Sequence, residues 1–129
     1  MTPEVNTELS ISTVARLKKD LESADEIELT VIGRKSGRKI PRPVWFVLDG
    51  DKLLLLSGSG RKSEWYKNVL KNPAVEISVS KHSYKFRAKM ASNQRVKEIV
   101  DKFREKYGEG DLKAYYKGFD AAVEIPLES

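Results

Sequence analysis

A chain of 129 residues is long enough for one domain that buries a single hydrophobic core. It contains no cysteine, which excludes disulfides, a thiolate nucleophile and cysteine-bound zinc. Its net charge of +5 favours an anionic partner, whether nucleic acid, a phosphate-bearing ligand or an acidic membrane surface.

No stretch of the sequence reaches the ~18 apolar residues that a membrane-spanning helix needs. The N-terminal stretch MTPEVNTELS has no signal-peptide pattern, so we expect a cytoplasmic protein without a transmembrane segment. Residues 1–7 are expected to be flexible, and the whole of 1–129 is expected to form one domain.

The first half of the chain predicts a helix and then three strands: Thr7 to Glu22, a strand that starts at Glu26, Val44 to Leu48, and Lys52 to Ser57. Apolar residues recur at helical spacing in the helix and alternate with polar ones in the first strand. Pro41-Arg42-Pro43 imposes extended geometry before the second strand. Asp49-Gly50-Asp51 makes a tight hairpin turn between the second and the third.

The second half predicts a short helix, a hairpin, a longer helix and a last strand: Ser63 to Lys71, Val75 to Val79, Tyr84 to Met90, a helix from Ser92 or Asn93 to Tyr107, and Ala121 to Pro126. Ser63 is expected to cap the short helix. Gly108-Glu109-Gly110-Asp111 is expected to break the longer one before a helical turn at Leu112 to Tyr116. Six strands that arrive mostly as hairpins predict a mainly β fold, an antiparallel sheet curled into a small barrel with helices outside.

The sequence offers little apparatus for acid–base or metal chemistry. His82 is the only histidine and lies in a predicted turn, so neither a histidine-rich metal site nor a Ser–His triad is indicated. The stretch Gly58-Ser59-Gly60-Arg61-Lys62-Ser63 follows a strand and opens a helix. It lacks the third glycine of the dinucleotide fingerprint and the spacer of a phosphate loop. We therefore expect no metal site and neither of those two nucleotide folds.

Positive charge is concentrated in two glycine-containing loops. The first contains Arg34, Lys35, Arg38, Lys39 and Arg42, and the second, residues 57–63, contains Arg61 and Lys62. In an antiparallel meander the connections after the first and third strands lie at the same end of the sheet, so about seven cationic groups are expected to line one cleft. Clustered like charges cost free energy unless an anion neutralises them. The alternative is that each loop is simply solvated.

Two kinds of anion are considered for this cleft. Nucleic acid would need aromatic side chains interleaved with basic ones on a solvent face, whereas Phe46 and Phe86 fall on apolar faces. Trp65 and Tyr66 directly follow the second basic loop, which suits one planar ligand with an anionic tail. Core packing is the alternative for Trp65. A non-catalytic basic barrel that binds nucleic acid is kept as an alternative function.

Several motifs occur in order over residues 26–80: Leu29-Thr30-Val31-Ile32-Gly33-Arg34-Lys35-Ser36-Gly37, Pro41 to Val44, Asp49-Gly50-Asp51, and EWYKNVLKNPAVEISV from Glu64 to Val79. They resemble the deazaflavin-dependent nitroreductase family of the flavin-reductase-like split β-barrels, which is related to pyridoxamine-phosphate oxidase. The resemblance implies an antiparallel split barrel that binds coenzyme F420, an 8-hydroxy-5-deazaflavin with a phosphate and glutamate tail. The implied activity is an oxidoreductase that passes hydride from the reduced cofactor to a quinone, a nitro compound or a similar acceptor. FMN is the alternative cofactor.

The resemblance also implies site residues in this sequence. Those for the cofactor are Arg34, Lys35, Ser36, Arg38, Arg42, Ser57, Gly58, Arg61 and Lys62, with Trp65 and Tyr66 beside them. Tyrosines near the acceptor have their nearest counterparts in Tyr107, Tyr115 and Tyr116, the candidate catalytic residues, for which packing is the alternative. The expected partners are the cofactor and a small acceptor, not nucleic acid. Split barrels are often dimers, although no feature of this sequence demands a second copy.

Overall fold

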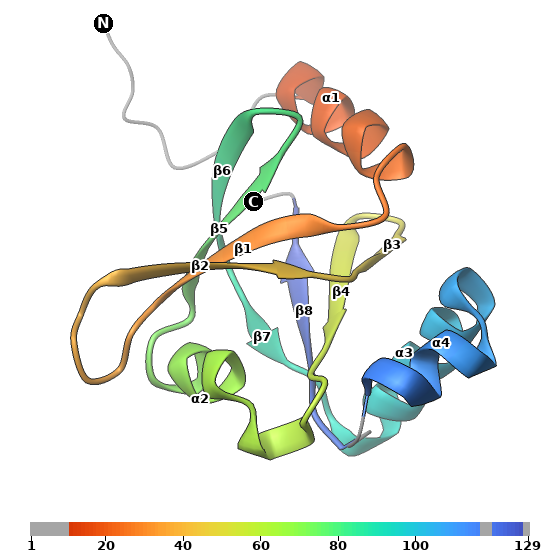
Figure 1. Ribbon diagram of the computed structural model, residues 1–129. Coiled ribbons are helices and arrows are strands. Elements are labelled where there is room, and N and C mark those ends of the chain that lie inside the picture. Colours follow the sequence, from red (N-terminus) through yellow and green to blue (C-terminus); the bar gives the residue numbers. More distant parts are fainter. Residues whose placement is uncertain (1–10, 117–119, 128–129) are drawn as a thin grey trace, which may run out of the picture.

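The computed structural model describes residues 11–116 and 120–127 (Figure 1). In chain order the elements are α1 (Ile11–Glu22), β1 (Ile27–Ile32), β2 (Lys39–Val44), β3 (Val47–Asp49), β4 (Lys52–Leu56), the 3-10 helix η1 (Gly60–Lys62), α2 (Glu64–Lys71), β5 (Ala74–Val79), β6 (His82–Arg87), β7 (Lys89–Met90), α3 (Asn93–Tyr107), α4 (Glu109–Tyr115) and β8 (Ala122–Pro126). Residues 1–7, which we expected to be flexible, and the predicted helical residues 7–10 lie outside the described part.

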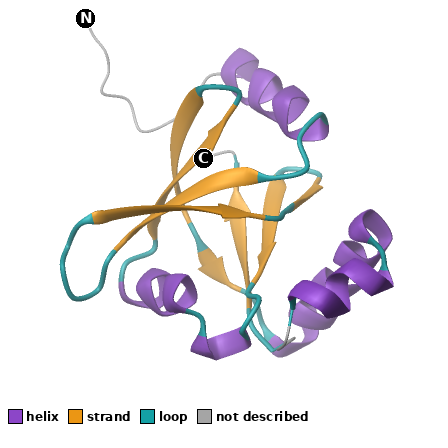
Figure 2. Cartoon of the chain, in the orientation of Figure 1, coloured by secondary structure: helices purple, strands orange, loops and turns teal. Residues whose placement is uncertain are grey.

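The strands form two antiparallel sheets with the orders β2-β1-β5-β6 and β3-β4-β8-β7 (Figure 2). The described strands correspond to the six expected runs, because two runs each change sheet. One run passes from β2 to β3 at Trp45-Phe46, and the other passes from β6 to β7 at Ala88. The result is a split-barrel arrangement with helices outside, as expected, although the two sheets do not close into a complete barrel.

The second strand begins at Lys39 and contains both prolines, whereas the sequence predicted a start at Val44. Proline is tolerated here because β2 is the outer strand of its sheet and pairs with β1 alone. The backbone N–H groups that the two prolines lack therefore interrupt no hydrogen bonding between inner strands of the sheet. Arg42 lies on this edge strand and lines the cavities described below.

The core has two parts, which explains the unbroken apolar run of β4. Leu53 and Leu55 belong to a large cluster between the two sheets, together with α1 and α2 residues. Leu54 and Leu56 point to the other face, where they pack with Ile99 and other residues of α3 and α4. Because both faces of β4 are covered, this strand does not alternate between apolar and polar residues.

The helix boundaries agree with the predictions except at two points. Ser92 caps α3, since its side chain accepts a hydrogen bond from the backbone N–H of Arg95. Ser63 precedes α2 but makes no capping hydrogen bond with its side chain, so that prediction was wrong. The helix α3 ends at Tyr107, and after the single residue Gly108 the helix α4 begins at Glu109 and not at Leu112. No described helix is both long enough and apolar enough to cross a membrane.

Candidate functional site

Two adjoining cavities open near the junction of the two sheets. The larger, of about 490 Å³, is lined by residues of β2, the following corner, the loop after β4, and Tyr116. The smaller, of about 310 Å³, is lined by residues of the β1–β2 loop and α2. Arg42 and Trp65 line both. We call them the large and the small cavity; each is of a size that suits a small-molecule ligand.

Arg34 ties the β1–β2 loop to α2. Its backbone N–H and its Nη1 both donate to Oδ1 of the buried Asn68, at 3.0 and 2.8 Å. Its Nη2 pairs with Glu64 at 2.9 Å, and this guanidinium lowers the pKa of the Glu64 carboxyl. The charge of Arg34 is therefore already met within the protein. Sequence reasoning missed Asn68, although it lies three residues after Trp65 on the buried face of a helix.

The two basic loops border the same residues, but not for the reason that we expected. The strands β1 and β4 belong to different sheets, so the meander rule does not apply to them. The second loop instead passes through η1 into α2, which packs back against β1 and holds Arg34. Trp65, at the start of α2, thereby lies between the two loops.

Fewer cations line the cavities than the predicted seven or so. Among the described residues they are Arg34, Lys35 and Arg42. Arg38 is exposed on the loop, with its backbone N–H donating to Ser36 Oγ, and Lys39 pairs with Glu76 at 2.8 Å. Lys35 and Arg42 have no ion-pair partner in the described part of the chain. These two charges are the ones left for a bound anion.

The second loop is held by contacts within itself and with residues that are distant in the sequence. Ser57 is fully buried and its hydroxyl donates to the carbonyl of Gly60, while Gly58 lines the large cavity. The Arg61 backbone N–H donates to Asp120 at 3.1 Å, and its Nη2 lies 3.4 Å from Asn93 Oδ1. Neither Arg61 nor Lys62 lines either cavity.

Replacing Gly60 by alanine is expected to destabilise the fold by ~1–3 kcal/mol. Gly60 has a φ of +63°, and an added Cβ would overlap with Asp120 Oδ1, the acceptor for the Arg61 backbone N–H. Gly110→Ala is the matched control, because nothing lies within 4 Å of the added Cβ. In a helix that change should stabilise by up to about 1 kcal/mol. Denaturant unfolding of both variants checks the opposite signs, and an unchanged Gly60→Ala would contradict the argument.

The two aromatic residues after the second loop have different surroundings. Trp65 is 5% exposed and belongs to the large core cluster. It also lines both cavities. Tyr66 packs in the same core cluster and lines neither cavity. Only Trp65 is therefore positioned to contact a ligand in these cavities.

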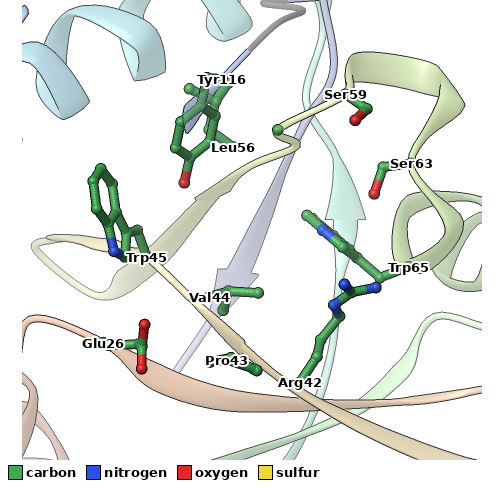
Figure 3. Close-up of a pocket in the computed structure, with 11 residues that line it drawn as sticks. Glu26, Arg42, Pro43, Val44, Trp45, Leu56, Ser59, Ser63, Trp65 and Tyr116 are labelled. Carbon is green, nitrogen blue, oxygen red and sulfur yellow. The ribbon is translucent and has the colours of Figure 1, made fainter. Parts of the chain in front are cut away.

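A second group of aromatic side chains forms the opposite wall of the large cavity (Figure 3). Trp45 lines it and stacks on Tyr107, with ring centroids 4.3 Å apart and an angle of 12° between the planes. Tyr116 lies 5.8 Å from Trp45 and points its hydroxyl into the cavity. Burial raises the pKa of Tyr116, so its phenol stays protonated at neutral pH. The side chain of Tyr115 lies outside the described residues, and Trp45 was missed by sequence reasoning.

Tyr107 holds the corner between β2 and β3. Its hydroxyl accepts from the backbone N–H of Phe46 at 3.1 Å and lies within donating distance of the carbonyls of Phe46 and Asp25, at 2.9 and 2.8 Å. Lys106 donates to the same Phe46 carbonyl at 2.8 Å. Tyr107 does not line the large cavity. Its visible contacts therefore support Trp45 and the corner, not a ligand.

Raising the pH from about 10 to about 12 is expected to lower the free energy of unfolding. Burial, the largest cause, raises the pKa of Tyr107 to about 12, whereas an unfolded tyrosine ionises near 10. Between these values the folded protein keeps a proton that the unfolded chain has lost. Titration of tyrosinate absorbance in the native and Tyr107→Phe proteins should differ by one phenol with a midpoint near 12. A midpoint near 10 would refute this assignment.

Comparison with known proteins identifies the family. The family model described as F420H(2)-dependent quinone reductase matches residues 4–127, nearly the whole chain. The chain belongs to this family. As a quinone reductase family member it is an oxidoreductase, and coenzyme F420 is its cofactor.

Solved structures show the same fold for this quinone reductase family member. An F420-H2 dependent reductase (FDR-A) matches with a TM-score of 0.62 and 19% identity, over 78% of this chain and 93% of that one. A domain-swapped dimer matches with a TM-score of 0.63 and 16% identity, over 90% of this chain and 99% of that one. HutZ, a heme storage protein from Vibrio cholerae, matches with a TM-score of 0.68 and 15% identity, over 89% of each chain. At these identities the neighbours show the fold alone.

The residues present fit the cofactor of the quinone reductase family. A deazaflavin has a planar ring system and an anionic tail, so its site must offer flat apolar walls next to cations. Trp65 and Trp45 supply such walls in the large cavity, and Lys35 supplies a cation in the adjoining small cavity. Arg42 lines both cavities and would supply a second cation to such a group.

Proposed function

We propose that this protein reduces a quinone or a related small planar acceptor with hydride from reduced coenzyme F420. One observation carries the proposal: a cavity with aromatic walls adjoins a smaller cationic cavity, and Arg42 and Trp65 belong to both. A ligand with a planar head and a negatively charged tail matches that pair of cavities. Neither a long polymer nor an uncharged ligand would need this arrangement.

In this proposal Lys35 and Arg42 bind the tail. Both side chains are exposed and have no ion-pair partner among the described residues, so a bound phosphate or carboxylate would meet uncompensated charge. Arg34 acts indirectly, because it fixes the loop that presents Lys35 through its bonds to Asn68 and Glu64. A loop that is fixed before binding loses less entropy when the ligand arrives.

In this proposal the large cavity holds the acceptor next to the planar ring of the cofactor. Coenzyme F420, when bound in its reduced form, supplies the hydride. Trp45 and Trp65 form apolar walls that would limit access of water and orient a flat acceptor. A quinone that gains hydride becomes a hydroquinone anion and needs one proton. The Tyr116 hydroxyl, protonated and directed into the cavity, is positioned to donate it.

Tryptophan fluorescence tests the proposal directly, because both tryptophans of the protein line the large cavity. Titration with coenzyme F420 should quench this fluorescence to saturation. Reduced coenzyme F420 should then be oxidised only when a quinone such as menadione is added, as its absorbance shows. Titrations with FMN and with a single-stranded oligonucleotide test the two alternative ligands. Saturable quenching by either of those, with none by coenzyme F420, would overturn the proposal.

A further inference from the structure

The large cavity carries opposite charges at its two ends. Arg42 lies beside Trp65, and Glu26 lies beside Trp45, with the cavity between them (Figure 3). Glu26 is the residue directly before β1, so it is fixed by the strand that it precedes. The proposed function uses the cationic end and leaves the acidic end without a role.

The charge of Glu26 acts on the aromatic wall. Burial is the main cause of the raised pKa of Tyr107, the ring stacked on Trp45, and the carboxylates of Asp25 and then Glu26 add to it. Within the described part of the chain Glu26 has no ion-pair partner. Among the described residues Arg42 is the one cation that lines the large cavity, and it also lines the small cavity, where the anionic tail is proposed to bind. Lys106, whose Nζ lies 5.0 Å from the centroid of the Tyr107 ring, does not line the large cavity. A negative field therefore remains beside Trp45 and Tyr116 once that tail is bound.

We propose that Glu26 determines which acceptors are used, by selecting against negative charge. Planar aromatic acceptors that are neutral or cationic can lie beside Trp45 and Tyr116, whereas an acceptor with a carboxylate or sulfonate is repelled. The inference rests on the proposed function, since it concerns the acceptor of that reaction. Glu26 is exposed, so water and salt weaken its repulsion, but a charged group on an acceptor beside Trp45 would lie close enough for one carboxylate to change its affinity by a modest factor.

The test compares menadione with a naphthoquinone sulfonate, a pair with the same kind of ring that differs in charge. For Glu26→Gln the ratio of the sulfonate KM to the menadione KM should fall roughly threefold to tenfold. This fall should shrink as the salt concentration rises. Glu28→Gln is the matched control, because Glu28 lies two residues further along and does not line the large cavity. That variant should keep the native ratio.

Quenching of tryptophan fluorescence by the two quinones gives a second readout that needs no turnover. The ratio of their dissociation constants should shift in the same direction for Glu26→Gln alone. If the native protein reduces neither quinone, the proposed function fails, and the quenching ratio still decides the role of Glu26. If menadione is reduced but both ratios are the same in Glu26→Gln and native protein, this inference fails and the proposed function stands. An equal shift in Glu28→Gln would also overturn it, because general surface charge would then explain the effect.

Discussion

The double variant Lys35→Ala/Arg42→Ala is expected to bind coenzyme F420 at least tenfold more weakly than the native protein. Each side chain would lose a charge-assisted contact to phosphate or carboxylate, which contributes ~1.5–3 kcal/mol. Both residues are exposed and make no ion pair in the described structure, so their removal should leave the fold intact. Arg34 is not chosen, because its side chain donates to the buried Asn68 and pairs with Glu64, so its loss would loosen the loop as well as remove a charge. Tryptophan fluorescence titration measures the affinity.

The double variant Arg61→Ala/Lys62→Ala is the matched control. It removes the same charge from the other basic loop, but neither residue lines a cavity. We expect its affinity to stay within about twofold of the native value, since exposed charges at a distance are largely screened. Equal weakening by both pairs would indicate general attraction of an anion to a basic surface. Weakening by the Arg61 and Lys62 pair alone would place the tail at the second loop.

Alternation of apolar residues predicted most of the fold because strands such as β1 and β5 cover a core on one face only. The exceptions have local physical causes. The two sheet changes, at Trp45-Phe46 and Ala88, occur within single extended runs and leave the periodicity nearly unbroken. The edge position of β2 decides where its prolines are tolerated, and edge positions depend on the pairing of strands that are distant in sequence. Alternation of apolar residues also says nothing about quaternary structure, so the homodimer stays a prediction.

The sequence predicted that the candidate site is positively charged, but not which of its charged residues are already paired within the protein. Glycines and cations in the sequence indicated an anion near Lys35 and Arg42. The sequence could not show that Arg34 is already paired, because its partners lie on α2, some thirty residues away. Trp45 and Glu26 were missed for a similar reason. They become neighbours only when the end of β2 comes to lie beside the start of β1.

Tyr107 is expected to act as a positioning residue, and its substitutions should separate this role from catalysis. Tyr107→Phe keeps the ring that stacks on Trp45 but leaves the Phe46 N–H without its acceptor. We expect a loss of ~1–3 kcal/mol in the free energy of unfolding, with kcat within a fewfold of native. Tyr107→Ala also removes the ring packed against Trp45 and Phe103. That larger loss, ~3–5 kcal/mol, should raise the KM for the acceptor as Trp45 loses its support.

Tyr116→Phe should show the opposite behaviour. Its hydroxyl points into the large cavity and has no hydrogen-bond partner among the described residues, so its removal should change stability little. Loss of a proton donor should lower kcat on the order of 10²-fold. Denaturant unfolding and steady-state kinetics on the same three variants measure both quantities. If Tyr107→Phe instead lost kcat at native stability, Tyr107 would be the proton donor, and its hydroxyl would have to leave Phe46 and Asp25 during turnover.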